Sequence, residues 1–290
     1  MDFQLTEDQR ALQSGVRELL AGRFGREALR ALADGPEQPS LDRELWRELG
    51  AAGFFALRLP ERDGGVGLGL PEAVLAFEEA GRALLPGPLV ATHLAAGEVE
   101  GAATGDTVVT AVDSSGLVPW LDASDVVRGD AAGAVPTRSV DPLTPLHRAP
   151  AGVGAPDPLA VLLTAAEQLG SSARSCETAV RYARERSQFG QPIGAFQAVK
   201  HLCAQMLVRT EVARAAVYAA AVTADRAEIS AAALLADEAA VQGARDCLQV
   251  HGGMGFTWEA DVHLHLKRAW LRAALGPSAG AVEEEWAAAL

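Results

Sequence analysis

The sequence predicts a mainly α-helical protein, and three observations support this class. Apolar residues recur at spacings of three and four over long stretches of the chain. Aromatic residues make up only 5% of the 290 residues and alanine is abundant, which favours helices packed through small side chains over a β-sandwich. Patches of β-branched residues are confined to the middle of the chain. We therefore expect an N-terminal helical domain over 1–106, a truncated β middle segment over 107–153 and a C-terminal four-helix bundle over 154–290.

The N-terminal part contains three helix signals. Thr6 and Gln9 form a capping box, which predicts a first helix over about 7–22. A second helix is expected over about 42–51, and glycine residues are expected to end it. Pro71 has the character of a first helical turn, so a third helix is expected to follow the glycine-rich stretch that precedes it.

The middle segment differs from the rest of the chain in composition. From Thr107 to Pro150, short β-branched patches alternate with Gly, Asp, Ser and Pro. This short stretch accommodates about four short strands at most. No large sheet is expected there.

The C-terminal part is helical almost to its end. Asp157 as N-cap and Pro158 at the first helical position begin one long helix. Further helices are expected over about 196–224, over about 230–250, and from Thr257 onward. Short loops between helices of this length predict antiparallel neighbours, and therefore a bundle.

Composition and charge exclude several classes of protein. The 49% apolar and 22% charged residues are typical of a globular chain, which excludes disordered, collagenous and disulfide-scaffold classes. The formal net charge of -13 disfavours nucleic acid and an anionic membrane surface as partners. Cys176, Cys203 and Cys247 are odd in number and far apart, which predicts neither disulfides nor a zinc site. Without a signal or spanning segment, the expected protein is soluble and cytoplasmic.

Two loops between the long helices are rich in glycine. One covers residues 186–193 and contains Arg186, and the other covers residues 249–256. A guanidinium beside glycine-opened backbone suits an anionic group such as a pyrophosphate, because arginine offers paired donors and glycine lets amides come close. Two ordinary helix-capping loops explain the same spacing equally well.

Longer motifs carry a family resemblance. Arg-Glu-Arg-Ser-Gln-Phe-Gly-Gln-Pro-Ile-Gly begins the stretch 184–201, and Gln-Val-His-Gly-Gly-Met-Gly-Phe begins the stretch 249–259. Together they resemble the C-terminal helical domain of the acyl-CoA dehydrogenase family. Phe-Glu-Glu-Ala-Gly-Arg and the glycine-rich stretch before it agree with the family's N-terminal part. The resemblance implies FAD as cofactor, an acyl-CoA thioester oxidised to the 2-enoyl-CoA, and electron-transferring flavoprotein as acceptor.

The resemblance also implies which residues bind the cofactor. In the family these positions contact the pyrophosphate and adenine end of an FAD that belongs to the neighbouring subunit, which implies a partner chain, either a longer homologous subunit or a second copy. Here they are Arg186, Gln188, Phe189, Ile193, Phe196, Gln249, Gly252 and Gly253.

The departures from the family concern the flavin ring and the catalytic base. The threonine- and serine-bearing strand motifs of the family's middle β-barrel are absent. The two positions at which the family places its base fall near Gly276 and near Ala160, and neither residue is a carboxylate. Glu167 and Glu259 are the nearest substitutes. Glu259 is better explained as a charge in the first turn of a helix than as a base. Glu167 is explained equally well as an interhelical ion-pairing residue.

Three hypotheses follow. The first is the smaller subunit of a heteromeric, FAD-dependent acyl-CoA dehydrogenase, whose catalytic base is not assigned to this chain. The second is a flavin-free assembly partner or a non-redox protein on the same scaffold. The third is a homomeric dehydrogenase whose base has moved to Glu259 or Glu167. Steroid-sized and short branched acyl groups both remain open, and the spacing of His263 and His265 argues against a metal site.

Overall fold

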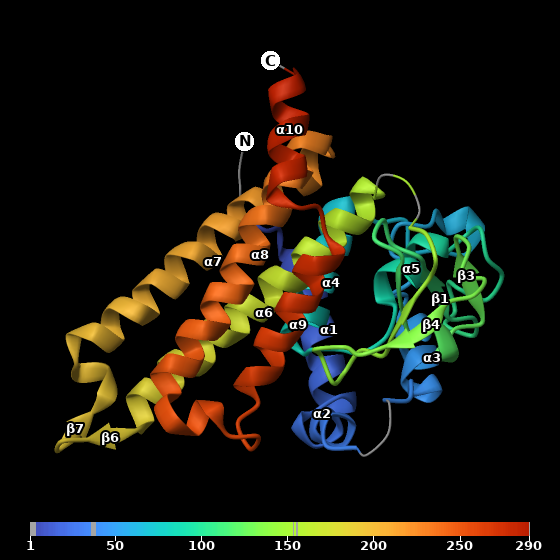
Figure 1. The fold of residues 1–290 in the computed structure, drawn as a ribbon. Helices are drawn as coiled ribbons and strands as arrows, with labels where there is room; N and C mark the ends of the chain where they lie inside the picture. Colours follow the sequence, from blue (N-terminus) through green and yellow to red (C-terminus); the bar gives the residue numbers. More distant parts are fainter. Residues whose placement is uncertain (1–3, 36–38, 153, 155, 290) are drawn as a thin grey trace.

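The computed structural model describes residues 4–35, 39–152, 154 and 156–289 (Figure 1). The expected boundary at residue 153 lies outside this part of the chain. Ten α-helices are found in the described residues, together with seven strands of two or three residues, which confirms the mainly α class.

The N-terminal third forms five helices. Their bounds are α1 Glu7–Arg23, α2 Arg26–Ala33, α3 Arg43–Ala51, α4 Leu70–Arg82 and α5 Leu89–Ala95. The Thr6–Gln9 capping box at the start of α1 is confirmed: Gln9 N donates to Thr6 Oγ1 and Thr6 N donates to Gln9 Oε1. The expectation of three helices here was incomplete, because α2 and α5 have only eight and seven residues, which is shorter than the window in which a helical period can be recognised.

The middle segment contains five strands of three residues each, one more than expected. These are β1 Val109–Ala111, β2 Leu117–Pro119, β3 Val126–Arg128, β4 Val135–Thr137 and β5 Leu146–Arg148. β1 pairs with β3 in parallel, and β5 pairs antiparallel with β2 on one side and β4 on the other. The two small sheets agree with the expectation that no large sheet fits here.

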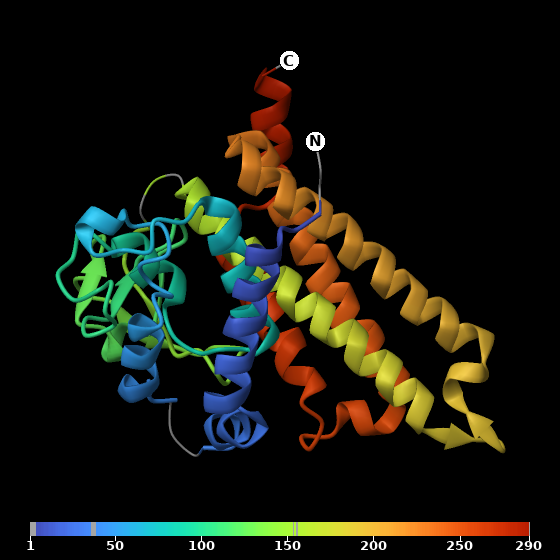
Figure 2. The same cartoon turned by 180° about the vertical axis from the view of Figure 1, so that it is seen from behind.

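The C-terminal half forms the bundle. Its helices are α6 Pro158–Glu185, α7 Gln197–Thr223, α8 Arg226–His251 and α9 Val262–Leu275, followed by α10 Ala279–Ala289 (Figures 1 and 2). The predicted start of the last bundle helix at Thr257 was wrong. A 3-10 helix, η4 Gly252–Phe256, and a turn come first, and α9 begins after Asp261. Glu259 therefore lies outside the helix rather than in its first turn.

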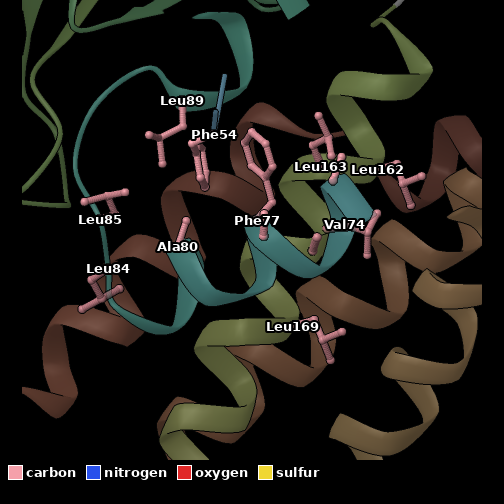
Figure 3. Close-up of a cluster of buried hydrophobic side chains, with 14 of the residues drawn as sticks. Phe54, Val74, Phe77, Ala80, Leu84, Leu85, Leu89, Leu162, Leu163 and Leu169 are labelled. Carbon is pink, nitrogen blue, oxygen red and sulfur yellow. The ribbon is translucent and has the colours of Figure 1, made fainter. Parts of the chain in front are cut away.

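Helices α4 and α6 cross closely, and two glycines permit the approach. A Cβ atom on Gly81 would lie 1.9 Å from the carbonyl oxygen of Glu167, and one on Gly170 would lie 1.8 Å from that of Glu78. Any side chain at either position would collide with backbone. Figure 3 shows the apolar cluster beside this crossing, where Phe77 of α4 faces Leu163 of α6.

Buried acidic residues join the N-terminal helices to the rest of the protein. Glu78 Oε2 accepts a hydrogen bond of 2.7 Å from the Tyr218 hydroxyl and also pairs with Arg214, both on α7. Arg268 of α9 pairs with the fully buried Asp141 of the middle segment. The three regions are thus held in one arrangement by paired buried charges.

Candidate functional site

The two glycine-rich loops lie at the same end of the bundle (Figures 1 and 2). One follows α6 as a tight hairpin of β6 Ser187–Gln188 and β7 Gln191–Pro192, and the other is η4 after α8. The rings of Tyr182 and His251, one from each helix end, stack with their centroids 4.0 Å apart. Antiparallel bundle topology therefore brings together two motifs more than fifty residues apart in sequence.

The hairpin presents its side chains to solvent. Arg186, Gln188 and Phe189 are all exposed, and Phe189 retains 93% of its accessible surface. Within the described residues, the Arg186 guanidinium has no recorded ion pair or hydrogen bond. Phe189 and Gly190 at the tip both have positive φ angles, of 53° and 80°, which turns the Phe189 ring outward into open space.

Two apolar residues support the base of this hairpin. Ile193 is partly buried and packs against the cluster formed by the ends of α6 and α8. The backbone N–H of Ile193 donates to the Arg186 carbonyl at 2.7 Å, which closes the hairpin. The Phe196 ring lies edge-on to Phe189 with the centroids 6.1 Å apart. Arg186 and Phe189 are thus exposed on a hairpin whose base is packed against the bundle.

The second loop offers open backbone. Gln249 and Gly253 are exposed, and Gly252 has φ +58°. A Cβ atom on Gly252 or Gly253 would find none of the described atoms within 4 Å, so there is open space beside both glycines. The Gly252 N–H donates to the Gln249 carbonyl. A guanidinium, an exposed aromatic face and uncovered glycine backbone at one end of the bundle fit a pyrophosphate with an attached flat ring.

A different cleft lies between α5 and the small sheets on one side and the bundle on the other. Its volume is about 440 Å³ and its lining is mostly apolar. Both Ala160 and Gly276, the two positions at which a base was expected by resemblance, line it. Seven charged residues line it as well, Glu167, Asp237 and Arg272 among them, and we call it the carboxylate cleft.

Glu167 and Arg272 form a buried ion pair. The distance from Arg272 Nη2 to Glu167 Oε1 is 2.5 Å, and both side chains are less than one-tenth exposed. Burial raises the pKa of Glu167, against the attraction of Arg272, and lowers the pKa of Arg272 to about 10. Arg272 Nη1 has no hydrogen-bond partner. The ion-pairing interpretation of Glu167 is therefore confirmed.

Asp237 was not singled out from the sequence. Its Oδ1 accepts a hydrogen bond of 2.8 Å from Gln168 Nε2, and its Oδ2 lies 3.7 Å from where a Cβ on Gly276 would stand. Burial raises the pKa of Asp237 to about 6. Nothing in the sequence marks this residue, because its approach to Gly276 depends on how α8 and α9 pack.

The remaining candidates lie elsewhere. Glu259 is exposed and lies outside the carboxylate cleft, and its carbonyl accepts a hydrogen bond from Arg26. His265 is buried with its Nδ1 2.8 Å from Ser171 Oγ, and the His263 ring stacks on Trp258. Among the described residues, no group of three His, Cys, Asp or Glu side chains is arranged to hold a metal ion. No described helix is long and apolar enough to cross a membrane.

The chain is similar to known proteins over most of its length. Residues 6–104 match the acyl-CoA dehydrogenase N-terminal domain, and residues 161–279 match the acyl-CoA dehydrogenase C-terminal domain. The chain is 37% identical to acyl-CoA dehydrogenase IpdE2 of Mycobacterium tuberculosis, over 91% of each chain.

Two solved structures share the whole fold. One is the ChsE4-ChsE5 complex from Mycobacterium tuberculosis, with a TM-score of 0.82 and 25% identity over 99% of this chain and 98% of that chain. The other is a variant of the Tcur3481-Tcur3483 steroid ACAD, with a TM-score of 0.82 and 25% identity over 97% of this chain and 99% of that chain. The chain belongs to the acyl-CoA dehydrogenase family, whose members are oxidoreductases.

Proposed function

We propose that this chain is the smaller subunit of a heteromeric acyl-CoA dehydrogenase that introduces an α,β double bond into an acyl-CoA thioester with FAD. The observation that carries the proposal is the supported but uncovered hairpin with Phe189 93% exposed beside the unpaired Arg186. Phe256, in η4 at the same end, is 76% exposed. Large apolar side chains gathered on one uncovered surface are typical of a surface that another chain covers.

The similar solved structures support a heteromer and a class of substrate. Two chains are named in the ChsE4-ChsE5 complex and two in the Tcur3481-Tcur3483 protein, which is described as a steroid ACAD. We therefore propose a steroid-derived acyl-CoA as the substrate. The partner would be a longer homologous subunit, with electron-transferring flavoprotein as the electron acceptor.

In this proposal the chain holds one end of the cofactor. When bound, FAD supplies the hydride-accepting chemistry of the reaction. Arg186 would donate paired hydrogen bonds to the pyrophosphate, Phe189 would offer its ring to the adenine end, and Gln249 with the backbone of Gly252 and Gly253 would complete that end. The flavin ring and the base that removes the α-proton would come from the partner, because Ala160 and Gly276 carry no carboxylate.

Assembly is the direct experiment. The chain would be purified alone and after co-expression with a longer homologous acyl-CoA dehydrogenase, and the masses compared by size-exclusion chromatography with light scattering. A mixed complex of both chains is the expected result. A stable complex of this chain alone that turns over acyl-CoA would instead support the homomeric hypothesis.

Replacing Arg186 tests the cofactor contact. Arg186→Ala in the assembled complex is expected to weaken FAD retention by about 1.5–3 kcal/mol, the usual worth of a charge-assisted hydrogen bond, with the fold unchanged. The measurement is FAD dissociation followed by flavin fluorescence. The matched control is Arg184→Ala, which replaces an exposed arginine near the C-terminal end of α6. Equal retention in the two variants would make Arg186 a surface residue only.

Two carboxylates of this chain test where the base resides. In the assembled complex, neither Glu259→Gln nor Asp237→Asn is expected to abolish turnover, whereas loss of a general base costs at least about a hundredfold in rate. Single-turnover reduction of the flavin by substrate measures this step. Asp237 is the stricter test, because its Oδ2 lies beside Gly276. A hundredfold slower step in Asp237→Asn, with FAD and assembly intact, would assign the base to this subunit.

A further inference from the structure

A second cleft separates the N-terminal helices from the bundle. Its volume is about 650 Å³, and it lies between α1, α2 and α4 on one side and α6, the end of α8, residues 259–261 and α9 on the other. Five arginines line it, namely Arg17, Arg26, Arg82, Arg174 and Arg181. We call it the arginine cleft. In a chain with a formal net charge of -13, this gathering of cations is a local exception that favours an anionic ligand.

Three of these arginines already have a carboxylate partner. The ion pairs are Arg17–Glu79, Arg26–Asp261 and Arg82–Glu177. The other two arginines do not have a close one. Arg174 forms one long ion pair, with Glu177 at 4.0 Å, and Arg181 makes no ion pair or hydrogen bond among the described residues. Glu259, which also lines the cleft, makes no ion pair with any of the five.

Arg174 and Arg181 share one face of α6 with two hydroxyl groups. Arg174, Thr178 and Arg181 follow at spacings of four and three, so they lie along the same side of the helix. Ser175, also in the wall of the cleft, is only 1% exposed, and its Oγ has no hydrogen-bond partner among the residues that the structure describes. A buried hydroxyl without a partner costs free energy, and an oxygen-rich ligand in the cleft would satisfy it.

The surroundings are positive enough to affect other groups. Burial, and then the charges of Arg82 and Arg181, lower the pKa of Arg174. Burial, and then the neighbouring arginines with Arg174 first among them, lower the pKa of His265 in the same cleft to about 3. His265 is therefore neutral at physiological pH. An anion bound here would relieve the repulsion between the cations.

We propose that the arginine cleft binds a phosphate monoester, held by Arg174 and Arg181 with the hydroxyls of Ser175 and Thr178. The guanidinium groups of Arg174, which has only a 4.0 Å ion pair with Glu177, and of Arg181 match the roughly two negative charges of such a phosphate at neutral pH. The guanidinium fork also matches the phosphate oxygens. Inorganic phosphate and a nucleotide such as AMP offer this same chemistry. The inference does not depend on the flavin-binding proposal, because none of the residues proposed to contact FAD lines the arginine cleft.

Isothermal titration of the full chain with inorganic phosphate and, separately, with AMP in chloride buffer tests this site. We expect saturable binding of at least one probe, and tighter binding of AMP would identify a nucleotide rather than the free ion. The Arg174→Gln/Arg181→Gln double variant is expected to weaken binding about tenfold or more. Ser175→Ala, which leaves the charge unchanged, is expected to weaken it less.

Arg184→Gln is the matched control, because it removes the same charge from α6 at a residue that does not line the cleft. Its affinity is expected to equal that of the unchanged chain. Circular dichroism establishes that each variant is folded. Absence of saturable binding of both probes to the unchanged chain, or an equal loss in Arg184→Gln, would overturn the proposal.

Discussion

Purified alone, the chain is expected to hold little FAD, whereas the co-expressed complex is expected to be yellow and to contain fewer flavins than subunits. The residues proposed for the adenine end are present and exposed, but the middle segment offers only five strands of three residues in two small sheets. Half of each flavin site would therefore be missing from this chain. Flavin absorbance after heat release, divided by protein concentration, measures the occupancy of each preparation.

The partner expressed alone is the control for this experiment. If the half-site account is right, the partner alone also retains less FAD than the complex, because it lacks Arg186 and the open glycine backbone of this chain. Stoichiometric FAD on the lone chain would contradict the account directly. A colourless complex would instead favour the flavin-free assembly partner.

Much of the fold follows from local sequence signals. Thr6 with Gln9, and Asp157 with Pro158, mark helix starts by capping chemistry that involves neighbours only, and both starts are confirmed. The last bundle helix shows the limit of such signals. The glycines at 252, 253 and 255 and the following turn delay α9 to Val262, although the acidic residues before it resemble a first helical turn.

The candidate site can likewise be predicted from sequence only in part. That the two glycine-rich loops meet at one end follows from bundle topology, which sequence periodicity can predict. Which side chains meet inside the carboxylate cleft depends on crossings that sequence does not specify. Glu167 of α6 pairs with Arg272 of α9 because these two helices, distant in sequence, pack against each other. Asp237 lies beside Gly276 because of how α8 and α9 pack, which local sequence signals do not specify either.

Glu167→Gln is expected to destabilise the protein by about 3–5 kcal/mol, the usual cost of removing one partner of a buried ion pair. Arg272 would remain buried with no countercharge in contact, and its Nη1 already lacks a partner. The raised pKa of Glu167 and the lowered pKa of Arg272 both have burial as their first cause, so desolvation dominates at this pair. The free energy of unfolding would be measured by urea denaturation of the isolated chain and compared with that of Glu259→Gln, an exposed control.

A double variant separates this structural role from a catalytic one. Glu167→Leu combined with Arg272→Met removes both charges while keeping similar volumes, and such replacements of buried pairs are often neutral or stabilising. We therefore expect the double variant to be more stable than Glu167→Gln alone. In the assembled complex, Glu167→Gln is expected to retain turnover, because its carboxylate is engaged by Arg272. If Glu167→Gln were instead as stable as Glu259→Gln yet about a hundredfold slower in the chemical step, Glu167 would be the base and this subunit would supply it.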